Sequence, residues 1–358
     1  MSLRTNMKAV AVAGITVALS MAVATQANAA KRVKWKMQNA WGATVPHLGT
    51  SAVRFVKAVS DMTEDKFQIK NFEPGALVPA LECFDAVSKG SIESCWTTPG
   101  YHAGKHPAAS FFTSVPFGPG LGEYVAWKWF GGGHELREKL YNKFGLTAKD
   151  NFCIGPETSG WFKEPVTDLA MLKGFKMRFF GLGAKVMTKL GVSTQLLAGA
   201  DIYPALEKGV IDATEFSMPT MDINYGFYQI AKNNYFPGWH QQTSCSELLM
   251  NKAKHDALPG SYKAVLTAAL GDAIIHTYAE TEAKNPDAMQ EMQVKHGVKV
   301  QRWTDDQLAT FEKLWNEVVV EESAKDAYFK EVADNFYAFR KNYAIWGDAQ
   351  RMKSTYLK

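Results

Sequence analysis

The sequence predicts an α/β protein of two lobes that ends in a helical segment. Apolar runs of strand length alternate with helical patterns over residues 33–97, and the same alternation restarts after a stretch rich in Gly and Pro over 116–133. Such alternation is typical of a largely parallel sheet covered by helices. From Thr304 to Leu357 the pattern is almost purely helical, which predicts a separate C-terminal segment.

Length and composition fit a globular protein of this kind. The chain has 358 residues, of which 46% are hydrophobic and 21% charged, and this excludes disordered and collagen-like proteins. Its 40 Lys and Arg residues and 36 Asp and Glu residues give a net charge of +4 without a long basic block. Since nucleic-acid binders usually present a concentrated basic face, we expect no nucleic-acid partner.

The first 29 residues have the organisation of a secretory signal peptide. Arg4 and Lys8 precede an alanine-rich apolar run that ends in Ala27-Asn28-Ala29, a small-residue cleavage motif. The run falls short of the roughly 20 strongly apolar residues that span a membrane. We therefore predict a cleaved leader over 1–29 and an exported protein that begins at Ala30.

The elements expected in the first lobe are a strand over 33–37, a helix over 51–62, a strand over 67–72, a helix over 77–89 and a strand over 92–97. The first strand alternates apolar and basic residues, which is the period of a half-buried strand. Pro74-Gly75 ends the second strand and Gly90 ends the second helix, because these residues interrupt regular structure.

The second lobe repeats this rhythm. Its expected elements are a helix over 134–144, strand-like residues over 152–162, a strand over 175–180, helices over 184–190 and 202–208, and a strand over 210–216.

The sequence leaves the state of the cysteines open. Cys83, Cys95, Cys153 and Cys245 belong to a chain predicted to be exported, where disulfides can form. They contain no CxxC pair, and buried thiols would fit the sequence as well as disulfides.

Motifs for catalysis and for nucleotide binding are missing. Gly181-Leu182-Gly183 follows a predicted strand and opens a predicted helix, but Val186 stands where a dinucleotide fingerprint has its third glycine. No GxSxG, HExxH or P-loop pattern occurs in the chain. An enzymatic function therefore lacks a recognisable nucleophile or cofactor motif.

Three charged residues stand out because their surroundings are apolar or aromatic. Arg178 lies at the C-terminal end of a predicted strand, where open α/β sheets place their ligand crevice. Its guanidinium could bind a carboxylate through two parallel hydrogen bonds, or could form an ion pair that stabilises the strand end. Glu215 ends another strand, and Glu157 precedes Trp161 in a loop. If the two carboxylates converge on one cleft, they repel each other, so either the pKa of one of them rises or they hold a cation. If they lie apart, each could be a solvated loop charge.

Several segments match one known family in the same order along the chain. They are 77–81, 84–87, 107–112, 115–118, 173–178 with 181–183, 210–215 and 236–240. With them the chain resembles the substrate-binding subunits of tripartite ATP-independent periplasmic (TRAP) transporters, the dicarboxylate-binding-protein family. The likeness is greatest to the branch that binds α-keto acids and related 2-hydroxy acids, and it covers nearly the whole mature chain.

This resemblance implies a two-lobed periplasmic binding protein with a mixed sheet in each lobe, a ligand cleft between the lobes and a long C-terminal helical segment. The boundaries we expect are 30–152 with 214–247 for the first lobe, 153–213 with 248–303 for the second, and 304–358 for the helical segment.

The resemblance also implies a binding site. Arg178 would bind the substrate carboxylate, and one cation, Na⁺ or Ca²⁺, would bridge protein and substrate. Its ligands would come from Glu157, Glu215, the backbone carbonyl of Phe216 and a further ligand, Gln241. All of these oxygen ligands suit a hard cation.

The apolar walls of the cleft would come from Tyr101, Trp161 and Phe216. Two positions depart from the branch, which has glutamine in place of Glu157 and tryptophan in place of Phe216. The additional carboxylate would favour a divalent ion over sodium, and the smaller ring would reshape the pocket.

The function implied is that of a periplasmic receptor, not an enzyme, which delivers a small organic acid to membrane permease subunits. Members of this branch can pair through long C-terminal helices, so the resemblance further implies a homodimer, whereas the alternative is a helical segment that packs across its own two lobes. Two alternatives stay open on the sequence. One is an exported hydrolase with Glu157 and Glu215 as acid and base, and the other is a binding protein that serves a sensor kinase.

Overall fold

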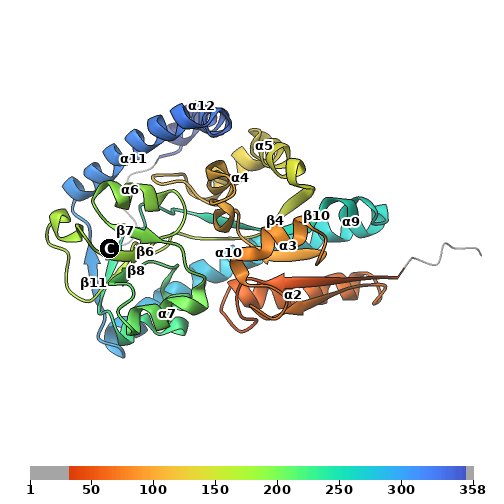
Figure 1. Ribbon diagram of the computed structural model, residues 1–358, viewed down its shortest axis with the longest axis horizontal. Helices are drawn as coiled ribbons and strands as arrows, with labels where there is room; N and C mark the ends of the chain where they lie inside the picture. The colour runs from red at the N-terminus through yellow and green to blue at the C-terminus, as the bar shows by residue number, and fades with distance from the viewer. Residues whose placement is uncertain (1–31, 352–358) are drawn as a thin grey trace, which may run out of the picture.

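Two sheets covered by helices form the body of the protein in the computed structural model, which describes residues 32–351 (Figure 1). The first sheet contains β1 (Val33–Asn39), β2 (Phe67–Phe72), β3 (Ser94–Thr97), β4 (Leu146–Ile154) and β10 (Ser244–Asn251), in the order β2-β1-β3-β10-β4. The second contains β5 (Trp161–Phe162), β6 (Lys176–Arg178), β7 (Ser193–Gln195), β8 (Ala213–Thr214), β9 (Asn233–Phe236) and β11 (Lys299–Arg302), in the order β11-β9-β5-β8-β6-β7.

Each sheet is mixed. In the first sheet β10 runs antiparallel to β3 and β4, and in the second β5 runs antiparallel to β8 and β9. The largely parallel arrangement predicted from strand and helix alternation therefore holds only in part, because the chain returns to the first sheet after building most of the second. The two-lobed α/β fold with a mixed sheet in each lobe is confirmed.

The helices cover both sheets and connect them. They are α2 (Leu48–Met62), α3 (Cys83–Ser88), α4 (Leu121–Phe130), α5 (Gly133–Tyr141), α6 (Gly183–Lys189), α7 (Gly199–Glu207), α8 (Pro219–Tyr225), α9 (Lys252–Asp256), α10 (Gly260–Val294), α11 (Asp305–Lys325) and α12 (Ala327–Ala349). The 35-residue helix α10 packs on β4 and α2 of the first lobe and on α8, so it spans the molecule. Within the described residues, no helix is both long and apolar enough to cross a lipid bilayer. The predicted leader over 1–29 lies outside the described residues.

The predicted helical C-terminal segment is confirmed up to Ala349 by α11 and α12. Helix α11 begins with a capping box, in which Thr304 accepts from the backbone N–H of Gln307 while the Gln307 side chain accepts from the N–H of Thr304. Helix α12 packs against α4, α5 and the 3₁₀ turn Pro107–Phe112 of its own chain. Figure 1 shows both helices along one edge of the molecule.

Several predicted elements have different limits, such as the strand expected over 210–216, which is only Ala213–Thr214. The strand expected over 152–162 is interrupted between β4 and β5 by an irregular stretch with Pro156, which has no N–H to donate, and Gly160, whose φ is 142°. The helix expected over 77–89 shortens to α3 after a 3₁₀ turn, Ala80–Glu82. The Gly- and Pro-rich stretch over 116–133 contains helix α4, because its glycines flank an apolar helical segment.

Strand pairing also corrects the lobe boundaries at two places. Strand β9 lies in the range 214–247 assigned to the first lobe, yet it pairs with β5 and β11 of the second sheet. Strand β10 continues in the first sheet to Asn251, beyond the predicted limit. The partner strands decide these positions. That the two lobes move relative to each other as bodies with the remaining predicted boundaries stays a prediction.

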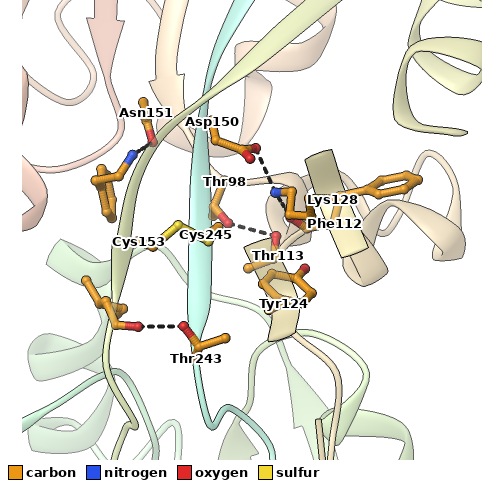
Figure 2. The surroundings of a disulfide bond; sticks show 12 residues. Thr98, Phe112, Thr113, Tyr124, Lys128, Asp150, Asn151, Cys153, Thr243 and Cys245 are labelled. Atoms are coloured by element: carbon orange, nitrogen blue, oxygen red, sulfur yellow. Dashed lines mark hydrogen bonds and ion pairs between the residues drawn. A yellow bond between two sulfur atoms is a disulfide. The ribbon is translucent and has the colours of Figure 1, made fainter. Parts of the chain in front are cut away.

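All four cysteines form disulfides, Cys83–Cys95 and Cys153–Cys245. The second bond links β4 to β10 within the first sheet, as Figure 2 shows. On one side of it the Thr243 hydroxyl donates to the carbonyl of Ile154 over 2.9 Å. The two strands that lead toward the second lobe are therefore tied to each other covalently and by a side-chain hydrogen bond.

A buried ion cluster lies on the other side of this disulfide. The ammonium of Lys128 lies 2.7 Å from a carboxylate oxygen of Asp150 and donates to the carbonyl of Phe112 (Figure 2). Arg137 pairs with the same carboxylate. These two cations hold the pKa of Asp150 well below its usual range, although burial alone would raise it. The cluster belongs to the core of the first lobe and does not line the cavity described below.

Candidate ligand and cation site

A small cavity of about 30 Å³ lies between the two sheets. Pockets for drug-sized ligands measure roughly 300 to 1,000 Å³, so this cavity suits a molecule of few atoms. Residues from the first lobe that line it include Trp41, Thr98, Tyr101, Ile154, Ser244 and Ser246. Its other lining residues include Glu157, Arg178, Phe180, Phe216, Ser217 and Gln241.

Arg178 ends strand β6, and parallel pairing with β7 and β8 fixes its backbone. Its side chain is 1% exposed. Nη1 donates to the carbonyl of Glu215 over 2.7 Å and to its Oε1 over 2.8 Å, while Nε donates to the carbonyl of Leu197 over 3.2 Å. Nη2 has no hydrogen bond to another described residue. One edge of the guanidinium is therefore held by protein, and Nη2 remains available to a ligand.

Two aromatic rings flank this guanidinium. Its central carbon lies 5.4 Å from the ring centroid of Phe216 and 5.8 Å from that of Phe180. Contacts of this kind favour a cation beside the faces of aromatic rings. The rings also keep water from the guanidinium, which strengthens any hydrogen bond it makes to an anion.

Glu215 follows β8 and is fully buried. Its Oε1 accepts from Arg178 and from the backbone N–H of Phe180, whereas Oε2 has no hydrogen-bond partner among the described residues. Burial alone would raise the pKa of Glu215, but the charge of Arg178 and the neighbouring His240 and Phe180 N–H bring it below its ordinary value. The residue is thus held as a carboxylate with one free oxygen.

Glu157 lies in the irregular stretch between β4 and β5. Its Oε1 accepts from the Ser217 hydroxyl over 3.2 Å, and its Oε2 accepts from the side-chain amide of Gln241. Burial, followed by the charges of Glu215 and Asp222, raises the pKa of Glu157 well above its ordinary value. The carbonyl of that Gln241 amide accepts from Ser114 over 2.9 Å.

Glu157, Glu215 and His240 form a potential cation-binding cluster. One ligand atom from each lies within 4.8 Å of the others, and all three side chains are buried. Neither ring nitrogen of His240 has a hydrogen-bond partner among the described residues, and Nε2 lies 3.5 Å from the free Oε2 of Glu215. Burying a polar atom without a hydrogen-bond partner costs free energy of folding. A cation at this position would offer these atoms a partner and remove that cost.

Sequence reasoning did not assign a role to His240. Its only signal was its position after Trp239 in the matching segment 236–240. The backbone carbonyl of Phe216, a predicted cation ligand, accepts no hydrogen bond from another described residue.

The structure corrects the prediction that Trp161 forms a wall of the cleft. The Trp161 ring is fully buried, its indole N–H donates to Asp222 over 2.7 Å, and it is not among the residues that line the cavity. The same Asp222 carboxylate accepts from the backbone N–H of Ser217 over 3.1 Å. Burial raises the pKa of Asp222 to about 7. Trp161 therefore lies behind the site.

The predicted aromatic walls Tyr101 and Phe216 do line the cavity. Trp41 and Phe180 complete them, and no sequence pattern distinguishes these two from the many other aromatic residues. Gly100 permits the approach of Phe180, since a Cβ at this position would lie 2.1 Å from the ring.

Comparison with known proteins finds a family model and a curated relative that match most of the chain. Residues 39–326 match the family model described as bacterial extracellular solute-binding protein, family 7. A curated relative from Nostoc sp., a monocarboxylate 2-oxoacid-binding periplasmic protein, is 34% identical over 352 residues, which cover 97% of this chain and 96% of the relative.

Two solved structures share the fold closely. A TRAP transporter solute-binding protein from Bordetella bronchiseptica, a dimer with copurified calcium and picolinate, superposes with a TM-score of 0.86 at 32% identity and covers 89% of this chain and 95% of that one. A TRAP periplasmic solute-binding protein from Pseudoalteromonas atlantica with bound sodium and pyruvate also gives 0.86, at 27% identity and coverage of 89% and 97%.

Proposed function

Because the chain belongs to family 7 of the bacterial extracellular solute-binding proteins, we propose that it is the solute receptor of a TRAP transporter. It binds a small 2-oxo or 2-hydroxy monocarboxylate together with one cation, and it delivers the acid to membrane permease subunits. The observation that carries this proposal is the convergence of Arg178 and Glu157 on one small cavity, with Glu215 paired to Arg178 at 2.8 Å directly behind it.

In this proposal Arg178 binds the substrate carboxylate. Its Nη2 can donate to one carboxylate oxygen without breaking any bond in the protein. The two parallel hydrogen bonds expected from the sequence would in addition require Nη1 to exchange Glu215 for the ligand. Tyr101 and Phe216 form apolar walls beside the acid.

The cation is held by Glu157, Glu215 and the carbonyl of Phe216, with Gln241 at its edge. The amide of Gln241 must turn its oxygen toward Glu157 to serve as a ligand. Such a flip exchanges two atoms of nearly identical size. A cation held by these oxygens would supply positive charge for the 2-oxo or 2-hydroxyl oxygen of the acid.

Charge balance favours a divalent ion such as Ca²⁺. Arg178 neutralises Glu215. Burial raises the pKa of Glu157, so this side chain ionises only when a cation binds beside it, and with the monocarboxylate it then contributes two negative charges. Two uncompensated charges away from water are strongly unfavourable, and a divalent ion removes both. The relatives support either ion, since one contains calcium and the other sodium.

Titration calorimetry of the mature protein tests the proposal. We expect pyruvate to bind in the presence of calcium and to bind at least tenfold more weakly after treatment with a chelator, because the bridging ion is then missing. A dependence on sodium in place of calcium would assign a monovalent ion. Failure of pyruvate and other 2-oxo or 2-hydroxy acids to bind under every ionic condition would contradict the function.

We propose a homodimer that forms through the C-terminal helices. Helix α12 leaves Ile345 and Trp346 76% and 61% exposed, and the Bordetella relative is described as a dimer. Burial of two such apolar side chains would favour association. Light scattering of the mature protein should give the mass of two chains, and a single-chain mass at micromolar concentration would contradict pairing.

The remaining alternatives gain no support. The family comprises solute-binding proteins, and Glu215 is engaged in an ion pair with Arg178, so the proposed role of the chain is binding without catalysis. Transport is favoured over service to a sensor kinase because the related structures are described as TRAP proteins. The periplasm is the proposed compartment, in line with the Nostoc relative.

A further inference from the structure

Two serine hydroxyls in the wall of the cavity have no assigned role. Ser244 and Ser246 belong to β10 and line the cavity, with exposed fractions of only 7% and 3%. Neither hydroxyl takes part in a hydrogen bond among the described residues, and neither is fully shielded, so both remain available to a molecule in the cavity. Other hydroxyls in this wall are engaged, since Thr98 bonds to Thr113 and Ser217 donates to Glu157.

The strand holds these serines in fixed positions. Cys245, which lies between them, forms the disulfide to Cys153, and Thr243 is bonded to β4 just before them (Figure 2). The register of β10 and β4 shifts between Cys245 and Glu247, so that Ser246 faces an irregularity of the ladder. Irregularities of this kind commonly re-aim a side chain next to a binding site.

The serines and the charged groups reach the cavity from different sheets. Arg178 belongs to the second sheet and Glu215 follows one of its strands, whereas β10 belongs to the first sheet. A ligand whose carboxylate and 2-oxo group face Arg178 and the cation therefore presents the rest of its chain to the first lobe. There it meets two polar groups that lack partners.

We infer that the acid carries a hydrogen-bonding group, such as a hydroxyl, on the carbon next to its 2-oxo group, and that Ser244 and Ser246 recognise this group. The inference rests on the proposed function and names its substrate class. A purely aliphatic chain would cover both hydroxyls without offering either a hydrogen-bond partner, which lowers affinity. The small volume of the cavity, about 30 Å³, favours a short acid.

The test compares two acids of nearly equal shape, 3-hydroxypyruvate and 2-oxobutyrate, in which a hydroxyl replaces a methyl group. Calorimetry with calcium present should give at least about fivefold tighter binding of 3-hydroxypyruvate to the mature protein. In the double variant Ser244→Ala with Ser246→Ala this ratio should fall to near one, because the partners of the ligand hydroxyl are gone.

Ser94→Ala is the matched control. Ser94 lies on β3 of the same sheet, its hydroxyl forms no hydrogen bond with another described residue, and it does not line the cavity. This variant should keep the wild-type ratio. Equal or tighter binding of 2-oxobutyrate by the wild type would overturn the inference, as would a ratio that survives loss of both serines. If neither acid nor pyruvate binds, the proposed function itself fails.

Discussion

Replacement of Arg178 by methionine should nearly abolish binding of the acid. The side chain is buried, and Nη2 is its only terminal nitrogen without a partner among the described residues. Without it the bound carboxylate would be a desolvated anion without its cation, a loss of about 2 to 5 kcal/mol. This corresponds to roughly thirtyfold to several thousandfold weaker binding in titration calorimetry.

Arg178→Lys should bind the acid weakly and stay closer to normal stability. Lysine keeps the charge beside Glu215 but loses the planar fork, whereas Arg178→Met also leaves the Glu215 carboxylate without its main partner. Circular dichroism therefore has to show that each variant is folded at the temperature of the titration.

Arg137→Lys serves as the control for loss of a buried arginine. Arg137 pairs with Asp150 in the first lobe, away from the cavity, so its replacement should lower the unfolding temperature without weakening acid binding. The assignment of Arg178 is wrong if folded Arg178→Met binds the acid within about threefold of the wild type, under ~0.7 kcal/mol.

Glu215→Gln should weaken calcium binding on the order of hundredfold. Glu215 supplies a buried carboxylate oxygen without a hydrogen-bond partner, and cation affinity depends strongly on the number of ligand charges. Glutamine keeps the size of the side chain but removes its charge. Calcium titration in the presence of a saturating acid measures the effect.

Glu157→Gln separates charge from shape at the same site. This substitution restores the glutamine that the resembling branch has, and it removes one of the two negative charges that favour a divalent ion. We expect about tenfold weaker calcium binding and an increased response to sodium.

Glu247→Gln is the matched control for both glutamate variants. Glu247 is fully buried, accepts from the Tyr141 hydroxyl and lies outside the cavity lining. Its replacement should leave calcium binding at the wild-type level. Wild-type calcium affinity in folded Glu215→Gln would remove this residue from the cation site.

Local pattern alone determined a large part of this protein. The alternation of strand and helix, the helical C-terminal segment and the position of Arg178 at a strand end follow from side-chain periodicity and from the residues that end regular structure. These features depend on neighbours within a few positions along the chain. The matching segments added the family, the cation and the class of acid.

The sequence could not choose partners for groups that are far apart along the chain. Cys153 and Cys245 are 92 residues apart, and they meet because β10 returns to pair with β4. Arg178 could have met a ligand or a carboxylate, and only the fold places Glu215 at 2.8 Å from it.

Tertiary packing likewise decided the orientation of individual side chains. Trp161 turns away from the cavity because Asp222 offers a buried acceptor for its indole N–H. His240 and the two serines of β10 reach the site because the strands of two sheets bring them there. Periodicity shows that a side chain is buried, but the element packed against it decides whether it meets the core, a charge or a ligand.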